Sequence, residues 1–121
     1  MNNNLIVNGL SVSGTDLVVT LPAVGGKVHY ITGIMINKVL SSPVATDTVG
    51  NFITATNLGG NFSFRNTVSA GSLGDDITVL NLQLAQPIVS KIEGVNTTFT
   101  IPNQPNTIHN VVIFYGVDFP V

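Results

Sequence analysis

The chain contains no cysteine among its 121 residues. Disulfide bonds, thiolate metal sites and cysteine nucleophiles are therefore excluded, and the redox compartment stays open. Tryptophan is also absent, so a sugar-binding platform of aromatic rings would depend on few residues. The two tyrosines, Tyr30 and Tyr115, lie in strongly apolar segments, where we expect them to pack in a core or an interface.

Charge is scarce as well. Charged residues make up 8% of the chain and the net charge is −2, whereas roughly a quarter of the residues of a typical globular protein are charged. The four basic residues are scattered, at Lys27, Lys38, Arg65 and Lys91. Nucleic-acid binding relies on clustered Lys and Arg that neutralise phosphates, so we expect no nucleic-acid partner. A neutral polar surface loses little ion hydration when protein covers it, which favours assembly.

Long apolar runs are missing too. No stretch approaches the roughly 18 residues of a membrane span, and the opening Met1-Asn2-Asn3-Asn4 lacks the basic region of a secretory signal. We therefore expect no membrane partner and synthesis in a cytoplasm. The length fits one domain, so residues 1–121 are predicted to form a single unit.

Short segments rich in Val, Ile, Thr and Phe alternate with clusters of Gly, Pro, Asn and Ser. Apolar residues recur at every second position, which is typical of strands and not of helices. The predicted strands are residues 16–22, 28–37, 52–56, 61–66, 77–85, 88–93, 97–101 and 108–117. Residues 38–51 are predicted to be a loop. About eight short strands indicate an all-β sandwich or barrel.

Two of these segments, 28–37 and 108–117, are apolar on both faces. In the first, the alternation places Val28, Tyr30, Ile34 and Ile36 on one face and His29, Ile31, Gly33 and Met35 on the other. A small sandwich buries only one face of each sheet. We therefore expect a second subunit or another partner to cover the remaining apolar face.

Residues 1–10 precede the first convincing strand. The patch formed by Leu5, Ile6 and Val7 is followed by Asn8-Gly9, a favourable turn or hinge. This segment is interpreted either as an edge strand of the chain's own sandwich or as a projecting arm. In the second case Leu5, Ile6 and Val7 would bind a partner by strand addition, which uses backbone hydrogen bonds.

His29 and His109 are the only candidates for a base near neutral pH or an imidazole ligand. They could form a metal pair or activate a serine. Alternatively, each is a strand histidine whose ring nitrogens are hydrogen-bonded or wet, and we favour this interpretation because a zinc site needs three or four ligands. The sequence shows no ligand-spaced cluster.

The carboxylates give no stronger signal. Gly74-Asp75-Asp76 could supply oxygens to calcium, but adjacent carboxylates usually diverge, and a solvated turn explains the pattern better. The remaining acids, Asp16, Asp47, Glu93 and Asp118, are isolated, and no nucleophile or phosphate-binding motif is present. We therefore predict no catalytic activity, no required cofactor and no metal.

A resemblance adds to this interpretation. Residues 26–37 (GKVHYITGIMIN) resemble a strand of small β-sandwich virion proteins of tailed bacteriophages. Gln86-Pro87-Ile88, residues 96–101 and residues 111–116 are similar to later elements of those proteins, although Tyr115-Gly116 reverses their usual Gly-Tyr order. The similarity covers roughly residues 20–117 and consists of strand patterns without catalytic residues.

The resemblance implies a jelly-roll-like β-sandwich of about eight antiparallel strands. It also implies a capsid decoration, or cement, protein that binds the major capsid protein on the outer surface of a bacteriophage head, commonly as a homotrimer. The chain would then be made in the host cytoplasm and reside in the virion. Two alternatives stay open: a carbohydrate- or receptor-binding module of a tail or fibre, and a shell-forming capsid subunit or a cellular adhesion domain.

Overall fold

The computed structural model describes residues 2–12 and 14–121, with side chains from Leu5 onwards. Its strands are β1 (Asn2–Leu10), β2 (Leu17–Leu21), β3 (Val28–Leu40), β4 (Phe52–Ala55), β5 (Ser63–Arg65), β6 (Asp76–Val89), β7 (Thr97–Ile101) and β8 (Thr107–Asp118). They form sheet A, in the order β1-β8-β3-β6, and sheet B, in the order β2-β7-β4-β5. No helix occurs in the described ranges, and the all-β prediction is confirmed.

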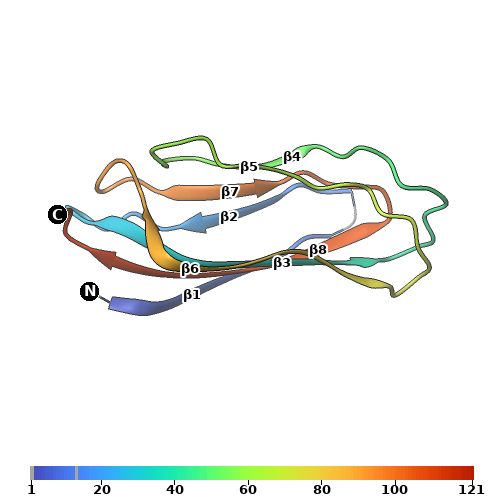
Figure 1. Cartoon of the computed structure of the whole chain (residues 1–121), viewed down its shortest axis with the longest axis horizontal. Helices are drawn as coiled ribbons and strands as arrows, with labels where there is room; N and C mark the ends of the chain where they lie inside the picture. The colour runs from blue at the N-terminus through green and yellow to red at the C-terminus, as the bar shows by residue number, and fades with distance from the viewer. Residues whose placement is uncertain (1, 13) are drawn as a thin grey trace.

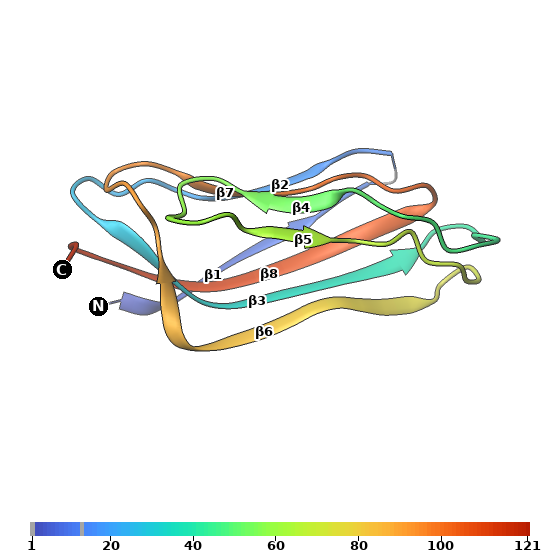
Figure 2. The ribbon, with the colours of Figure 1, turned by 45° about the horizontal axis from the view of Figure 1, so that its top comes forward.

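The strands pair in the order of a jelly roll. β1 pairs with β8, β2 with β7, β3 with β6 and β4 with β5, always antiparallel. The chain is therefore arranged as one long hairpin that wraps into two layers. Figure 1 shows these layers, with sheet B above sheet A, and Figure 2 shows them turned. The predicted jelly-roll-like sandwich is confirmed, and β1 is one of its eight strands.

The hydrophobic core lies between the sheets and follows the alternation of the strands. In β2, for example, Leu17, Val19 and Leu21 are buried, whereas Val18 and Thr20 are exposed. The buried core cluster contains Leu17, Val19, Leu21, Ile31, Ile34, Ile36, Ile53, Phe99, Ile101, Val111, Ile113 and Tyr115. Fully burying a large apolar side chain contributes about 1.5–3 kcal/mol relative to leaving it exposed, so these side chains hold the two layers together.

β3 changes its inward-facing positions along its length. Its register with both neighbours shifts between Ile31 and Gly33, which makes Thr32 part of a β-bulge. Ile31 faces the core before the bulge, whereas Ile34 and Ile36 face it afterwards. The prediction that the even-numbered apolar residues of 28–36 share one face is therefore wrong, because the bulge moves the inward positions from odd to even numbers.

β6 joins two segments that were predicted as separate strands, 77–85 and 88–93. Pro87 reads as a strand breaker in sequence, but β6 is an edge strand, where a missing N–H is tolerated. Gln83 pairs with Gly33 and Ile88 pairs with Ile31, so the residues between them bulge away from β3. Figure 2 shows the C-terminal end of β6 turning towards sheet B, where Lys91 N donates to Asn57 O.

β3 also extends to Leu40, beyond its predicted end at residue 37. Residues 38–40 therefore belong to the strand and not to the predicted loop. The alternation continues through them, since Lys38 and Leu40 are both buried. The segment after β3 does form a loop, and isolated bridges join Val44 to Gly71 and Thr48 to Val68.

Candidate interaction surface and buried polar clusters

The outer side of sheet A carries a broad surface with little charge, which we call the neutral face. The carboxylate of Asp76 lies at its margin, where Asp76 pairs with Val39 and accepts from Asn37 Nδ2. Outward positions follow from the register and from the alternation of side chains across a sheet. The neutral face consists of Ile6, Asn8, Leu10, Met35, Asn37, Thr78, Asn81, Gln83, Asn110, Val112 and Phe114. Several of its apolar side chains are exposed: Leu10 by 72%, Ile6 by 57% and Met35 by 39%.

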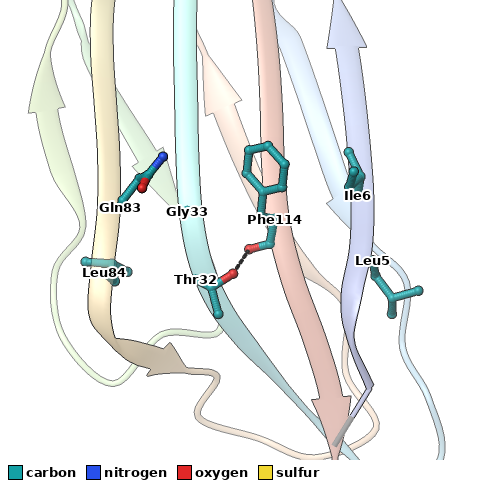
Figure 3. A pocket seen from close by; sticks show the side chains of 7 residues that line it. All are labelled: Leu5, Ile6, Thr32, Gly33, Gln83, Leu84 and Phe114. Carbon is teal, nitrogen blue, oxygen red and sulfur yellow. Dashed lines mark hydrogen bonds between the residues drawn. The ribbon is translucent and has the colours of Figure 1, made fainter.

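A hollow of about 410 Å³ crosses the neutral face above Gly33. Figure 3 shows Gly33 at its centre, with Gln83 of β6 on one side and Phe114 of β8 on the other. Gly33 has no side chain to fill the space, and a Cβ added there would lie 3.2 Å from Phe114 Cδ2. At the bulge, the Thr32 hydroxyl donates to Phe114 O at 3.2 Å, so a side-chain hydrogen bond joins β3 to β8 beside the hollow.

A second hollow, of about 440 Å³, lies further along the same face. Met35 of β3, Asn81 of β6 and Val112 of β8 contribute to its walls. These three residues are direct partners across the sheet, since Met35 pairs with both Asn81 and Val112. The neutral face is therefore uneven, with the exposed Met35 beyond the hollow above Gly33.

The predicted partner-binding residues Leu5, Ile6 and Val7 all lie in β1. This strand is the edge of its own sheet, paired with β8, which is the first of the two interpretations of residues 1–10. Leu5 and Val7 pack against the core, and only Ile6 projects outward. Partner binding by this strand stays a prediction. Of the three residues, Ile6 is the one whose side chain is exposed and could contact a partner.

His29 belongs to a buried hydrogen-bond cluster at one end of the sandwich. Its ring Nε2 lies 2.8 Å from Pro22 O, which can only accept, so Nε2 carries the proton. Nδ1 then accepts from the Thr97 hydroxyl at 2.8 Å, and Asn57 Nδ2 donates to Thr97 Oγ1 at 3.2 Å. Both ring nitrogens are satisfied by neutral partners, as the structural interpretation of this histidine expects.

His109 lies in a second cluster, built around the buried Lys38. Lys38 Nζ donates to Asn66 Oδ1 at 2.9 Å, to Gln104 Oε1 at 3.1 Å and to Thr67 O. Asn66 Nδ2 donates to His109 Nε2 at 2.8 Å, and Gln104 Nε2 donates to Asn66 O at 2.6 Å. The three ammonium hydrogens thus have three neutral acceptors, while His109 Nδ1 is buried with no protein partner.

Burial changes the proton affinity of both basic groups in this cluster. It lowers the pKa of Lys38, an effect that the charge of Asp47 partly offsets. Burial, together with the charge of Lys38, lowers the pKa of His109 from 6.5 to about 4. His109 is therefore neutral at physiological pH, which avoids placing two cations side by side.

The two histidines do not form a joint site. His29 pairs with Val117 at one end of β8, whereas Lys38 is the strand partner of His109. These positions are nine residues apart along β3, which is about 30 Å of strand, so the alternative of a metal pair is wrong. Neither ring contacts a serine hydroxyl: Ser90 and Ser11 instead accept from the backbone N–H groups of the two histidines.

The Asp75-Asp76 pair also diverges. Asp75 Oδ2 accepts from the Ser72 N–H at 2.8 Å, whereas Asp76 Oδ1 accepts from Asn37 Nδ2 at 3.0 Å. Across residues 2–12 and 14–121, no group of three or more potential metal ligands is found among the His, Cys, Asp and Glu side chains. The same residues contain no helix with the length and apolar character needed to cross a membrane.

Sequence reasoning missed Lys38 as a buried residue. The signal is its spacing: Lys38 stands two residues after Ile36 and two before Leu40, which follows the inward alternation of β3. For Tyr115 the sequence prediction is confirmed, because this residue is 7% exposed within the core cluster. Tyr30 is half-buried, and its hydroxyl donates to Phe119 O at 3.2 Å.

Comparison with known proteins adds no family to this description: no protein-family model matches the chain, and no curated protein matches it.

Proposed function

We propose that this chain is a structural protein of a virus particle, a decoration protein that binds the outer surface of a bacteriophage head through the major capsid protein. The observation that carries the proposal is the neutral face, a large, sparsely charged and partly apolar surface on a jelly-roll scaffold. Jelly rolls occur in viral capsid proteins and in lectins. In this role the chain works by contact alone, without a catalytic step or a cofactor.

The chemistry of the neutral face suits contact with protein. Covering charged groups costs hydration free energy unless they are paired, whereas amide side chains can exchange water for hydrogen bonds to a partner. Contacts of modest strength also accumulate when a symmetric lattice repeats them. We propose that the chain is a symmetric homo-oligomer on that lattice, and the resemblance to bacteriophage proteins favours a trimer.

The open edge of β1 supports a second mode of contact. β1 runs over nine residues, Asn2–Leu10, without charge or proline, and such edges readily pair with another strand. The other edges are protected: β6 contains Pro87 and bulges, β5 is three residues long, and β2 is five residues long and followed by Pro22. We propose that β1 contacts the capsid protein, with Ile6 projecting into the contact.

The test measures binding of the purified chain to bacteriophage heads from which outer proteins have been removed. We expect electron density of the chain on the outer capsid surface and loss of binding in the variant Ile6→Lys. Val18→Lys is the matched control, since Val18 is also 57% exposed but lies in β2 of the other sheet. Heads that bind neither the wild type nor the control would overturn the capsid role.

Carbohydrate or receptor binding is a second candidate, which the hollow above Gly33 favours because Phe114 offers a ring and Gln83 an amide. Binding of specific glycans on an array, abolished by Phe114→Ala, would support this candidate. The third candidate, a shell-forming subunit, requires the purified chain to assemble into closed shells by itself.

A further inference from the structure

The hollow above Gly33 and the exposed Met35 lie close together on β3. The hollow has no side chain at its centre, and its walls are formed by Leu5, Ile6, Thr32, Gln83, Leu84 and Phe114. Met35, two residues further along, projects outward because the bulge at Thr32 turns Ile34 and Ile36 towards the core. One short piece of strand therefore presents both a cavity and a side chain that could fill such a cavity.

A two-fold axis would bring these two features together. Residues two apart in a strand are separated by about 6.6 Å. Suppose that the two-fold axis lies in the plane of the interface, perpendicular to β3, and passes over Ile34. The second copy of β3 then runs in the opposite direction, and the positions of Gly33 and Met35 are exchanged. Met35 of each copy then lies above Gly33 of the other, and both hollows are filled by the same symmetric contact.

We propose that the neutral face binds the neutral face of a second copy of this chain, with Met35 of each copy inserted into the hollow above Gly33 of the other. The inference rests on the homo-oligomer that forms part of the proposed function, and it names the surface of that oligomer. The two-fold axis makes the assembly a dimer, in place of the trimer that the resemblance favours. This dimer covers the neutral face, including Ile6, so in that assembly the capsid contact is left to the open backbone edge of β1.

The side chain and the surface chemistry both fit this occupant. Methionine is unbranched and flexible, so it adapts to an irregular space. Around it the exposed polar groups are mainly amides and hydroxyls, from Asn8, Asn81, Gln83, Asn110 and Thr78. An amide both donates and accepts hydrogen bonds, so the face can pair with an identical copy. The carboxylate of Asp76 lies at the margin of the face, opposite Val39. Because Val39 is five residues from Ile34, the two-fold axis would keep the two copies of this carboxylate about 33 Å apart along the strand.

The area is sufficient for a specific dimer. Four strands spaced about 4.8 Å apart, over about 30 Å of their length, present roughly 600 Å² per copy. A pair of faces would thus bury roughly 1,200 Å², which is at the lower end of the range for specific protein interfaces. We therefore expect a reversible dimer that dissociates on dilution.

The experiment measures the mass of the purified full chain by light scattering over a dilution series. The chain has a mass of 12.7 kDa, so we expect twice that mass at high concentration. Met35→Lys should raise the dissociation constant by roughly 100-fold or more, because it would bury an unpaired ammonium. Met35→Leu, which keeps an apolar side chain, should remain a dimer.

Two controls make the result decisive. Val18→Lys adds the same charge to the outer side of sheet B and should leave the dimer intact. Thermal unfolding shows whether Met35→Lys remains folded; if it does not, Gln83→Lys places the charge at the rim of the same hollow. A folded lysine variant that still dimerises would overturn the proposal.

The failures of the two proposals are distinguishable. A wild-type monomer at every concentration would remove both the homo-oligomer and its interface, and a trimer would remove the two-fold contact alone. Head binding is measured separately, so a dimer that does not bind heads would leave this inference standing and overturn the capsid role.

Discussion

His109 combines complete burial with a titratable ring, so its protonation bears directly on the stability of the fold. Burial and Lys38 lower its pKa from 6.5 to about 4. Below pH 6.5 the unfolded chain binds a proton that the folded chain excludes until about pH 4. The free energy of unfolding should therefore fall as the pH is lowered through this window, by about 3 kcal/mol.

Urea unfolding of the wild type and of His109→Gln between pH 7 and pH 4 tests this prediction. Glutamine offers an amide oxygen to Asn66 Nδ2 but does not titrate, so the variant should lose much less stability across the window. Equal pH dependence in the two proteins would show that the depressed pKa of His109 does not control acid stability.

Gly50 is a second residue with a large expected effect, because the backbone of Asn66 lies directly against it. A Cβ added at Gly50 would be 1.7 Å from Asn66 O and 2.9 Å from Gln104 Nε2. Gly50→Ala must therefore displace the segment that positions the partners of Lys38. We expect a loss of about 2–3 kcal/mol in the free energy of unfolding, or more.

Gly59→Ala is the matched control for this substitution. A Cβ at Gly59 would meet nothing within 4 Å, and surface substitutions of this kind usually change stability by less than about 0.5 kcal/mol. Denaturant titration of both variants gives the comparison. Similar stabilities would mean that the loop around Gly50 adjusts freely.

At the scale of the element, β1 is the strand whose removal is most informative. Leu5 and Val7 pack against the core, and β1 covers the edge of β8. Deleting residues 1–9 should therefore lower the free energy of unfolding by at least about 2 kcal/mol, since it removes two half-buried apolar side chains and a ladder of hydrogen bonds.

Thermal unfolding measures the effect, and deletion of residues 120–121, which are exposed beyond β8, serves as the control. An arm that only contacts partners would leave the thermal stability unchanged when it is deleted. Unchanged stability would therefore contradict the contribution of β1 to its own core.

The strands differ in how well their sequences predict them. β2 and β7 alternate strictly between buried and less buried positions, so the period of two is sufficient to place them. For β6 the sequence predicts two strands, one on each side of Pro87, because a proline is acceptable only at an edge or a bulge. The sequence does not state which strand lies at an edge. The sequence also does not reveal the bulge at Thr32. Apolar residues occupy both faces of β3, so a change in the inward-facing positions leaves no break in the pattern.

The buried cluster of Lys38 and the neutral face also depend on more than local pattern. Asn66 and Gln104 reach Lys38 from segments 28 and 66 positions away, and no local spacing reports such a meeting. The neutral face is partly visible in sequence, because the low charge and the doubly apolar strands point to a covered surface. The hollow above Gly33 is not visible in the sequence, because it forms only when Gln83 and Phe114 lie on either side of Gly33.

For the whole molecule, the scarcity of charge and the fold act together. A net charge of −2 on 121 residues gives little repulsion between copies, so contact between neutral faces would meet only a weak long-range electrostatic barrier. The jelly roll displays the outer side of sheet A as one continuous surface. The scarcity of charged residues and the broad exposed sheet thus favour the same outcome, which is association with another protein.

The pairing of β1 with β8 also determines when the fold can be completed. Leu5 and Tyr115 are strand partners. During synthesis, β1 therefore cannot pair until β8, about 110 positions later in the chain, has been made. Folds dominated by such distant contacts form slowly, and their unpaired strands are open to aggregation in the meantime. Sheet A therefore closes after β8 has been synthesised, and until then β1 is a free edge that other chains can capture.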